Sequence, residues 1–187
     1  MIIGKSVLHA KQSKGKIYSK DKVLGYYNDM SNKVLQCKAL DEYGIPFNVI
    51  DTGEKVYFPI AIFQYGLGAY DLFLLNYNEE YLGKFKKCLE WALKMQMSNG
   101  AWNNFACVNA TNPYSAMSQG EGNSLLLRAY LEFNNDDYLN AAKNAIDFML
   151  KSIAEGGTAI YDRDDLYLKE FIDKPVVLNG WIFTIFG

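Results

Sequence analysis

The polar side chains that could carry chemistry gather at the start of one otherwise apolar segment. Tyr114, Ser115, Ser118, Gln119 and Glu121 precede and open a leucine-rich stretch. Hydroxyl and amide groups can hydrogen-bond a polar substrate, and a carboxylate can also accept or return a proton. Because the apolar stretch has no wide polar face, we expect a buried helix whose N-terminal end forms part of a binding site.

The residue inventory argues against several kinds of site. The only histidine is His9, which lies near the N-terminus. This argues against a catalytic triad and also against a histidine-based metal centre. Cys37, Cys88 and Cys107 are an odd number of well-separated cysteines, which fits neither a disulfide framework nor a zinc site. Proton transfer would therefore use carboxylates, tyrosines, lysines or cysteines.

Charge and hydropathy limit the kinds of partner that this chain can bind. The net charge is −2 and the only arginines are Arg128 and Arg163, so we expect no nucleic-acid surface. The sequence shows no signal peptide and no apolar run of membrane-spanning length. We therefore expect a cytoplasmic location by default, with secretion as the open alternative, and no membrane partner. Asp162, Asp164 and Asp165 lack the remaining ligands of a calcium loop, so we interpret them as a polar turn and expect no metal.

Two helical hairpins are predicted along the chain. The first pairs a nearly apolar helix over residues 60–75 with an amphipathic helix over residues 79–97. The second pairs residues 113–133 with residues 138–153. Apolar residues recur at intervals of three and four in each amphipathic segment, with most charged residues away from that stripe. We therefore expect one buried and one half-exposed helix in each hairpin.

The second hairpin repeats the first. A shift of 57 positions places Glu80-Tyr-Leu82 on Asp137-Tyr-Leu139 and Gly100 on Gly157, and a third copy opens over residues 175–186. Repeated hairpins stack, and the nearly all-apolar first helices favour a closed ring over an open superhelix. The predicted fold class is all-α: residues 57–187 form an α/α toroid of repeated helical hairpins, here an incomplete arc of about two and a half hairpins.

Residues 1–56 are predicted to form an extended lead-in to this domain. Short strands are expected around Val34–Leu40 and Phe47–Ile50, separated and followed by turn signals. In a ring of helical hairpins, the polar ends of the inner helices and the adjacent loops line the central cleft. Site residues are therefore expected in the loops over residues 98–102 and 156–174.

A series of short motifs, in order along the chain, resembles one protein family. From about residue 24 to its end, the chain is similar to the C-terminal domain of the D-glucuronyl carbon-5 epimerases of heparan-type polysaccharide synthesis. The resemblance implies an isomerase that inverts carbon 5 of D-glucuronate residues in a polysaccharide, giving L-iduronate. Removing and returning a proton beside a carboxyl group requires no redox cofactor. The motifs are Tyr57-Phe-Pro-Ile60, Gln64-Tyr-Gly-Leu67, Asn99-Gly-Ala-Trp102, Tyr114-Ser-Ala-Met117, Gln119-Gly120, Arg128-Ala-Tyr130 and Val177-Leu-Asn-Gly180.

The resemblance implies one catalytic residue. Lys169-Glu-Phe171 is similar to the family's Glu-Glu-Tyr segment, which places Glu170 at the position of the catalytic glutamate. Phe171 departs from the family's tyrosine. The alternative is that Glu170 is a solvated loop acid. The family's later segment, which holds a tyrosine and an arginine of the active site, corresponds to sequence beyond Gly187. The resemblance therefore implies that the epimerase is incomplete in this chain and that its second base comes from that later segment.

The resemblance also implies substrate-binding residues. Tyr27, Tyr114 and Gln119 match family positions at the sugar cleft, and Asn179 matches a position that either binds the sugar or bridges inner helices. Glu121 stands where other members have an amide. It is either an extra acid in the cleft or a carboxylate stabilised by the positive end of the helix dipole.

Arg128 matches the family pattern as well. It lies well inside a predicted buried helix, where a charged side chain requires a partner. We therefore interpret Arg128 as a structural residue that forms an ion pair or binds backbone carbonyls, rather than as a substrate clamp.

Two other functions are compatible with the sequence. A polysaccharide lyase or uronyl hydrolase could use the same scaffold, because a lyase shares the proton-abstraction step. Alternatively, the chain is a non-catalytic, glycan-binding remnant. The expected partner is a uronate-containing polysaccharide, and the apolar flank of the last helix could pair two copies of the chain in a homodimer.

Overall fold

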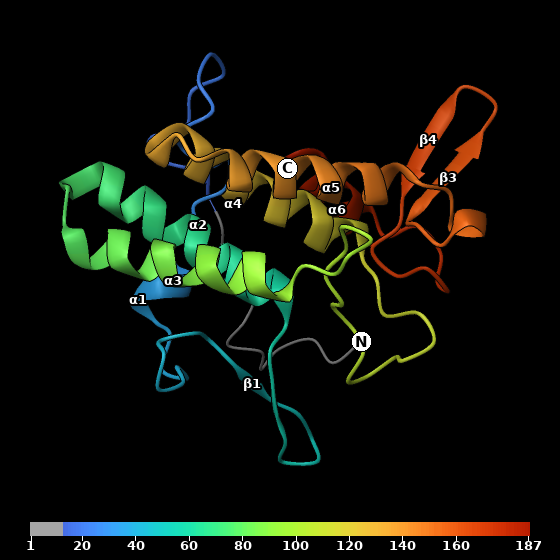
Figure 1. Ribbon diagram of the computed structural model, residues 1–187, viewed down its shortest axis with the longest axis horizontal. Coiled ribbons are helices and arrows are strands. Elements are labelled where there is room, and N and C mark those ends of the chain that lie inside the picture. Colours follow the sequence, from blue (N-terminus) through green and yellow to red (C-terminus); the bar gives the residue numbers. More distant parts are fainter. Residues whose placement is uncertain (1–12) are drawn as a thin grey trace.

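The computed structural model describes residues 13–187, and His9 lies outside the described residues. The chain is mostly helical, with six α-helices packed against one another and two small antiparallel hairpins (Figure 1). No described helix is both long and apolar enough to cross a membrane. The prediction of a mainly helical fold is confirmed.

The two helical hairpins form as the repeat predicts. The first consists of α2 (Pro59–Asn76) and α3 (Glu79–Met95), and the second of α4 (Ala116–Phe133) and α5 (Asp136–Leu150). Helices α2 and α4 are buried along most of their length, whereas α3 and α5 bury one stripe each. The predicted contrast between buried and half-exposed helices is confirmed.

The same turn chemistry closes both hairpins. Tyr77 and Asn134, which lie 57 positions apart, adopt left-handed backbone conformations with φ of 53° and 51°. The asparagine that follows each of them caps the next helix, since Asn78 and Asn135 each accept a hydrogen bond from a backbone amide two residues on, at 2.9 Å. The internal repeat is therefore also a repeat of local structure.

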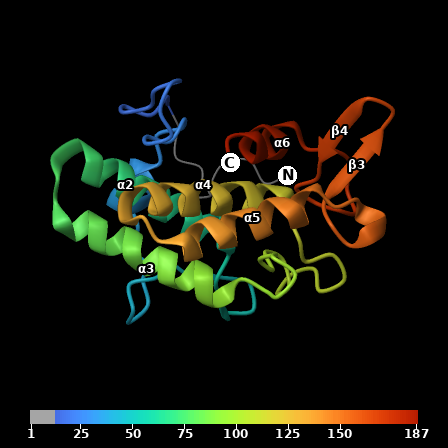
Figure 2. The same ribbon diagram turned by 45° about the horizontal axis from the view of Figure 1, so that its top comes forward.

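The third copy of the repeat contributes one helix, α6 (Leu178–Ile185), which packs on α4. Helix α4 thus lies between α2 and α6 in an inner row, with α3 and α5 on the outside (Figure 2). The contact between α4 and α6 is close, because a Cβ on Gly120 would collide with the Thr184 backbone. The described residues form an arc of this arrangement, and a closed ring is not seen in them.

The prediction for the lead-in is partly wrong. Ser31–Leu35 form a short helix, α1, which overlaps the first expected strand region at Val34 and Leu35. The reason is packing, because the Met30 carbonyl and the buried side chain of Val34 lie against α2, where Gly68 leaves room for the backbone. In the second region Asn48–Val49 do form a strand, β1, which pairs with Lys55–Val56, β2.

A second hairpin was not predicted. Strand β3 (Ala159–Asp162) pairs antiparallel with β4 (Asp165–Leu168) within a segment expected to be a loop. A two-residue turn joins them, with Arg163 in a left-handed conformation (φ 55°). The neighbouring acidic residues close this turn, as their interpretation as a polar turn requires, and the described residues contain no group of side chains arranged to hold a metal ion.

Arg128 anchors the lead-in to the helical core. Its Nε donates to the Leu24 carbonyl at 2.7 Å and its Nη2 donates to the Gly25 carbonyl at 3.1 Å. Next to it, the Tyr26 backbone amide donates to Asp71 Oδ1 at 3.1 Å. The interpretation of Arg128 as a carbonyl-binding structural residue is confirmed. These bonds hold the lead-in against α2 and α4 and so fix one side of the candidate site.

Candidate functional site

Glu121 is the most deeply buried acid near the inner row of helices, with no exposed surface. Gln64 of α2 donates a hydrogen bond from Nε2 to Glu121 Oε1 at 2.8 Å. The other carboxyl oxygen, Oε2, has no hydrogen-bond partner among the described residues. Because α4 begins at Ala116, Glu121 lies in the second turn, so its interpretation as a first-turn carboxylate stabilised by the helix dipole is wrong.

The surroundings of Glu121 favour the neutral acid. Burial raises the pKa of Glu121 to about 8, the hydrogen bond from Gln64 and the charge of Lys33 act in the opposite direction, and Glu170 raises it. Burial also lowers the pKa of the Lys33 ammonium, which Glu121 raises in turn. Glu121 is hydrogen-bonded to Gln64 and lies within electrostatic range of Lys33 and Glu170. We call these four residues the acid cluster, and its interior favours the protonated form of Glu121.

Glu170 reaches this cluster from the segment that follows β4. The backbone of Lys169 fixes that segment, because its carbonyl accepts from the Ala116 amide at 2.8 Å and its amide donates to the Thr158 carbonyl at 2.9 Å. The Glu170 carboxylate packs against the backbone of α6 at Gly180, where a Cβ would collide with it. Glycine at position 180 thus leaves room for the carboxylate.

Glu170 is half-buried, so it differs from a fully solvated loop acid. Burial raises the pKa of its carboxyl, and the Lys174 ammonium lowers it. A carboxylate with a raised pKa is a stronger base than a solvated one, and partial exposure keeps it within reach of a ligand. Glu170 can therefore accept a proton from a molecule bound beside α6.

Two predicted site residues lie along α6 and are exposed. The Tyr27 ring packs at a tilt against Phe186 at the C-terminal end of α6, with ring centroids 4.4 Å apart. Asn179 lies in the first turn of α6, and its side chain makes no hydrogen bond to any described residue. Both side chains can reach a ligand that lies along this helix.

The other two predicted residues face different elements. Gln119 is fully buried and bridges to the loop after α3, because its Oε1 accepts from the Trp102 amide at 3.2 Å and its Nε2 donates to the Trp102 carbonyl at 3.1 Å. Tyr114 packs edge-on against Phe148 of α5, with ring centroids 4.8 Å apart. The structure therefore brings Glu121 and Glu170 together but places Tyr114 and Gln119 at the junction of α4 with that loop and α5.

Sequence reasoning missed two members of the acid cluster, Gln64 and Lys33. The signal for Gln64 was present, because Gln64 and Glu121 are equivalent positions in the 57-residue repeat. Equivalent residues of neighbouring parallel inner helices lie at the same height and can meet. For Lys33 no such signal existed, since α1 lies outside the repeat.

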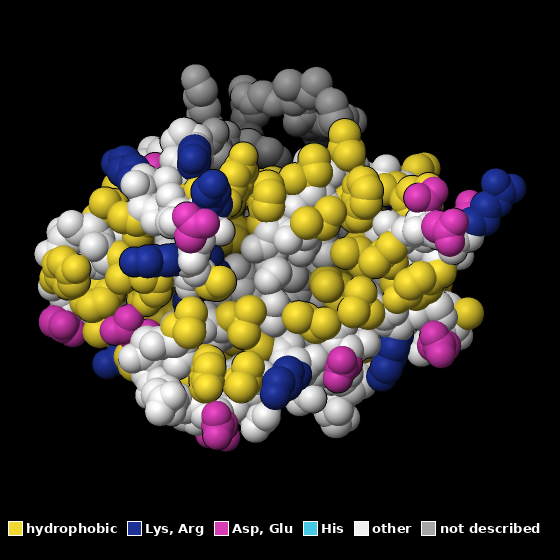
Figure 3. Space-filling view, turned by 90° about the horizontal axis from the view of Figure 1, so that it is seen from above, with side chains coloured by type: hydrophobic (Ala, Val, Ile, Leu, Met, Phe, Trp, Pro, Cys, Tyr) yellow, Lys and Arg dark blue, Asp and Glu magenta, His cyan; other side chains and the backbone are white. Residues whose placement is uncertain are grey.

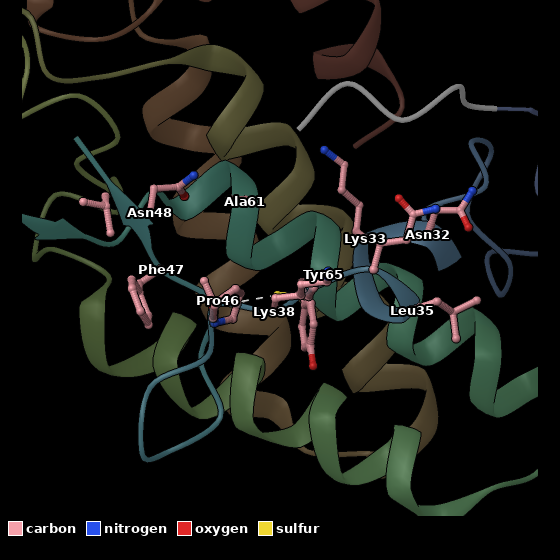
Figure 4. Close-up of a pocket in the computed structure, with 13 residues that line it drawn as sticks. Asn32, Lys33, Leu35, Lys38, Pro46, Phe47, Asn48, Ala61 and Tyr65 are labelled. Atoms are coloured by element: carbon pink, nitrogen blue, oxygen red, sulfur yellow. Dashed lines mark hydrogen bonds between the residues drawn. The ribbon is translucent and has the colours of Figure 1, made fainter. Parts of the chain in front are cut away.

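A pocket of about 870 Å³ opens beside this cluster, between α1, the segment over residues 46–49 and α2 (Figure 4). Ala61 and Tyr65 of α2 line one side of it. Lys33 lines the pocket and also belongs to the acid cluster, so the two sites adjoin. None of the residues predicted from the sequence to form the site lines this pocket.

Comparison with known proteins agrees with the resemblance seen in the motifs. A family model described as D-glucuronyl C5-epimerase C-terminus matches residues 88–187, which is more than half of the chain. The D-glucuronyl C5-epimerase of Caenorhabditis elegans is 29% identical over 120 residues, which cover 59% of this chain and 20% of that protein. The match thus spans about a fifth of that relative's length. The chain belongs to the D-glucuronyl C5-epimerase C-terminal domain family.

Proposed function

We propose that this protein is an isomerase that inverts carbon 5 of D-glucuronate residues within a polysaccharide to give L-iduronate. The observation that carries the proposal is the half-buried carboxylate of Glu170, a member of the acid cluster that is held against the backbone of α6, in a chain of this family. The substrate class comes from the family and from the relative's name.

The chemistry requires a base on one face of the sugar and an acid on the other. Glu170 accepts the proton as the bond between carbon 5 and hydrogen breaks, and the electron pair moves into the adjoining carboxyl group. An acid on the opposite face of the sugar then donates a proton to carbon 5, and the electron pair returns from the carboxyl group to form the new bond. That acid regains a proton from water, and Glu170 releases its proton to water, which completes the inversion. Substrate and product have the same atoms and oxidation state, so the reaction needs no oxidant or reductant.

The proposed binding residues divide into two groups. Tyr27 and Asn179, both exposed along α6, contact the sugar directly. Tyr114, Gln119 and Glu121 form the supporting wall: the first two position the start of α4, and Glu121 keeps the interior beside Glu170 uncharged.

Proton exchange at carbon 5 in heavy water tests this proposal. The 187-residue chain is incubated with a polymer of alternating glucuronate and N-acetylglucosamine, and both the deuterium at carbon 5 and the content of iduronate are measured by NMR. We expect incorporation without new ultraviolet-absorbing chain ends. Glu170→Gln should lower the rate by about 100-fold or more, because it removes the base and preserves the shape. The matched variant Glu90→Gln, at an exposed site on α3, should leave the rate unchanged.

The outcomes separate the alternatives. Unsaturated chain ends would identify a lyase, because elimination at carbon 4 follows the same proton abstraction. Absence of exchange, with the polymer still bound, would contradict catalysis by this chain and favour a glycan-binding domain. Exchange at an unchanged rate in Glu170→Gln would remove Glu170 from the mechanism.

We also propose that two copies of the chain pair through α6. Leu178, Ile182 and Ile185 are 64%, 40% and 59% exposed, and hydrophobic side chains gather on the face that includes this helix (Figure 3). The first two inner helices each pack on an outer helix, whereas α6 has no outer partner among the described residues. A second copy would cover it. Sedimentation equilibrium that shows only monomer at high protein concentration would contradict this pairing.

A further inference from the structure

The pocket beside α1 has the size and shape of a ligand site. Its volume of about 870 Å³ falls within the range of small-molecule sites, roughly 300–1,000 Å³. Figure 4 shows its walls: α1 on one side, Pro46, Phe47 and Asn48 on another, and Ala61 with Tyr65 along α2. Three separate segments thus converge on one space.

The charge around the pocket selects an anion. Lys33 and Lys38 line it, and the lining residues include no aspartate or glutamate, although the chain as a whole carries a net charge of −2. Lys55 lies near the same wall, with its ammonium 4.7 Å from the centre of the Phe47 ring. Lys38 is exposed and forms no ion pair with a described residue. The Lys33 ammonium is directed toward the acid cluster, so Lys38 and the nearby Lys55 make this wall of the pocket locally basic on an acidic protein.

The remaining polar groups suit a polyhydroxylated ligand. Asn32, Gln36 and Asn48 bring three side-chain amides to the lining, and each amide offers both donors and an acceptor. Hydroxyl groups on a sugar ring need such paired donors and acceptors, whereas a simple anion needs donors only. Phe47 and Tyr65 add aromatic surface of the kind that packs against the apolar face of a sugar.

The geometry points to this pocket as a second binding subsite, which holds a uronate residue of the polysaccharide away from the reacting sugar. Lys38 binds the sugar carboxylate and the amides bind its hydroxyls. Lys33 connects this subsite to the acid cluster, and in Figure 4 its side chain extends away from Pro46 and Phe47. The inference rests on the proposed polysaccharide substrate, but it concerns binding and not proton transfer.

Binding of a short oligosaccharide tests the subsite independently of catalysis. The Glu170→Gln chain is titrated by calorimetry with an oligosaccharide of alternating glucuronate and N-acetylglucosamine, and with the same oligosaccharide after its carboxyl groups are reduced to alcohols. Adding Lys38→Gln should weaken binding by about tenfold or more, the loss expected for one charged hydrogen bond. Reduction of the carboxyl groups should weaken it at least as much. Lys143→Gln, at an exposed site on α5, is the matched control and should have no effect.

The cysteines report where the ligand lies. Cys37 lines the pocket and is half-buried, whereas Cys107 is exposed in the loop before α4. The bound oligosaccharide should slow maleimide labelling of Cys37, measured by peptide mass spectrometry, and leave Cys107 labelling unchanged.

Any one of five outcomes overturns the inference. These are no binding, binding that is insensitive to Lys38→Gln, binding that is insensitive to carboxyl reduction, no protection of Cys37, and displacement of the oligosaccharide by inorganic phosphate at matched ionic strength. If the subsite binds as expected but carbon 5 does not exchange in the unmodified chain, the proposed catalytic function fails and the subsite remains. If exchange occurs without this binding, only the subsite fails.

Discussion

Glu121→Gln is the substitution that most directly tests the acid cluster. The amide has the shape of the neutral carboxyl, and its oxygen can still accept the hydrogen bond from Gln64 that Glu121 Oε1 accepts at 2.8 Å. At the other carboxyl position, both the protonated acid and the amide leave a donor without a partner. The substitution therefore removes the titration of this group while preserving most of its contacts.

The expected effect follows from the raised pKa of Glu121. The carboxyl has a pKa of about 8 in the folded protein and about 4.3 in the unfolded chain. Between these values the folded state binds more protons, so the free energy of unfolding falls as the pH rises, by up to about 1.4 kcal/mol per pH unit. The stabilisation is fully present below the lower pKa and is lost above the higher one. From pH 6 to pH 8 the loss amounts to roughly 2 kcal/mol.

Urea unfolding at pH 6, 7 and 8, followed by tryptophan fluorescence, measures this slope. The unsubstituted chain should lose roughly 2 kcal/mol more over the interval than Glu121→Gln. A smaller fall should persist in the variant, because burial raises the pKa of Asp71 to about 7. Glu90→Gln, the exposed control, should run parallel to the unsubstituted chain. Parallel curves for Glu121→Gln would refute the assignment of Glu121 as a buried neutral acid.

Two further predictions concern the attachment of the lead-in and the close contact beneath it. Gly68→Ala places a methyl group against the Met30 carbonyl and should lower the free energy of unfolding by about 1–3 kcal/mol. Gly83→Ala, which has open space at its Cβ, is the control and should raise the free energy of unfolding by about 0.5–1 kcal/mol. Urea unfolding measures both. Arg128→Met removes the donors to two lead-in carbonyls and should cost about 3 kcal/mol, with faster tryptic cleavage in the lead-in. Arg163→Met in the exposed β3–β4 turn is its control, and equal cleavage in both variants would contradict the anchoring role.

The helical hairpins could be predicted because their signals are local. Apolar residues that recur every three or four positions define the buried stripes. Asparagines at the turns cap α3 and α5, so both hairpins can be predicted from short windows of sequence. The ends of the helices differ from the prediction by a few residues. Helix α4 begins at Ala116, three residues later than expected, because Ser115 is extended, with φ of −141° and ψ of 128°.

Some elements could not be predicted, because partners distant in the sequence decide them. Residues 31–35 carry no strong helix pattern, and they form α1 directly after Met30, whose backbone Gly68 of α2 admits closely. Strands β3 and β4 are four residues each, too short for alternation to stand out, and they form by pairing with each other. The predicted closed ring likewise depends on packing beyond the arc that the described residues form.

The sequence by itself determined the family, the paired helices and the list of polar residues available for chemistry. Only the tertiary structure decided which of those residues share one environment. It joined Glu121 to Gln64 across 57 positions, brought Glu170 and Lys33 to the same cluster, and turned Gln119 toward the loop at Trp102. The physical reason is that burial and Coulomb interactions depend on distance in space, which short-range patterns in a sequence do not record.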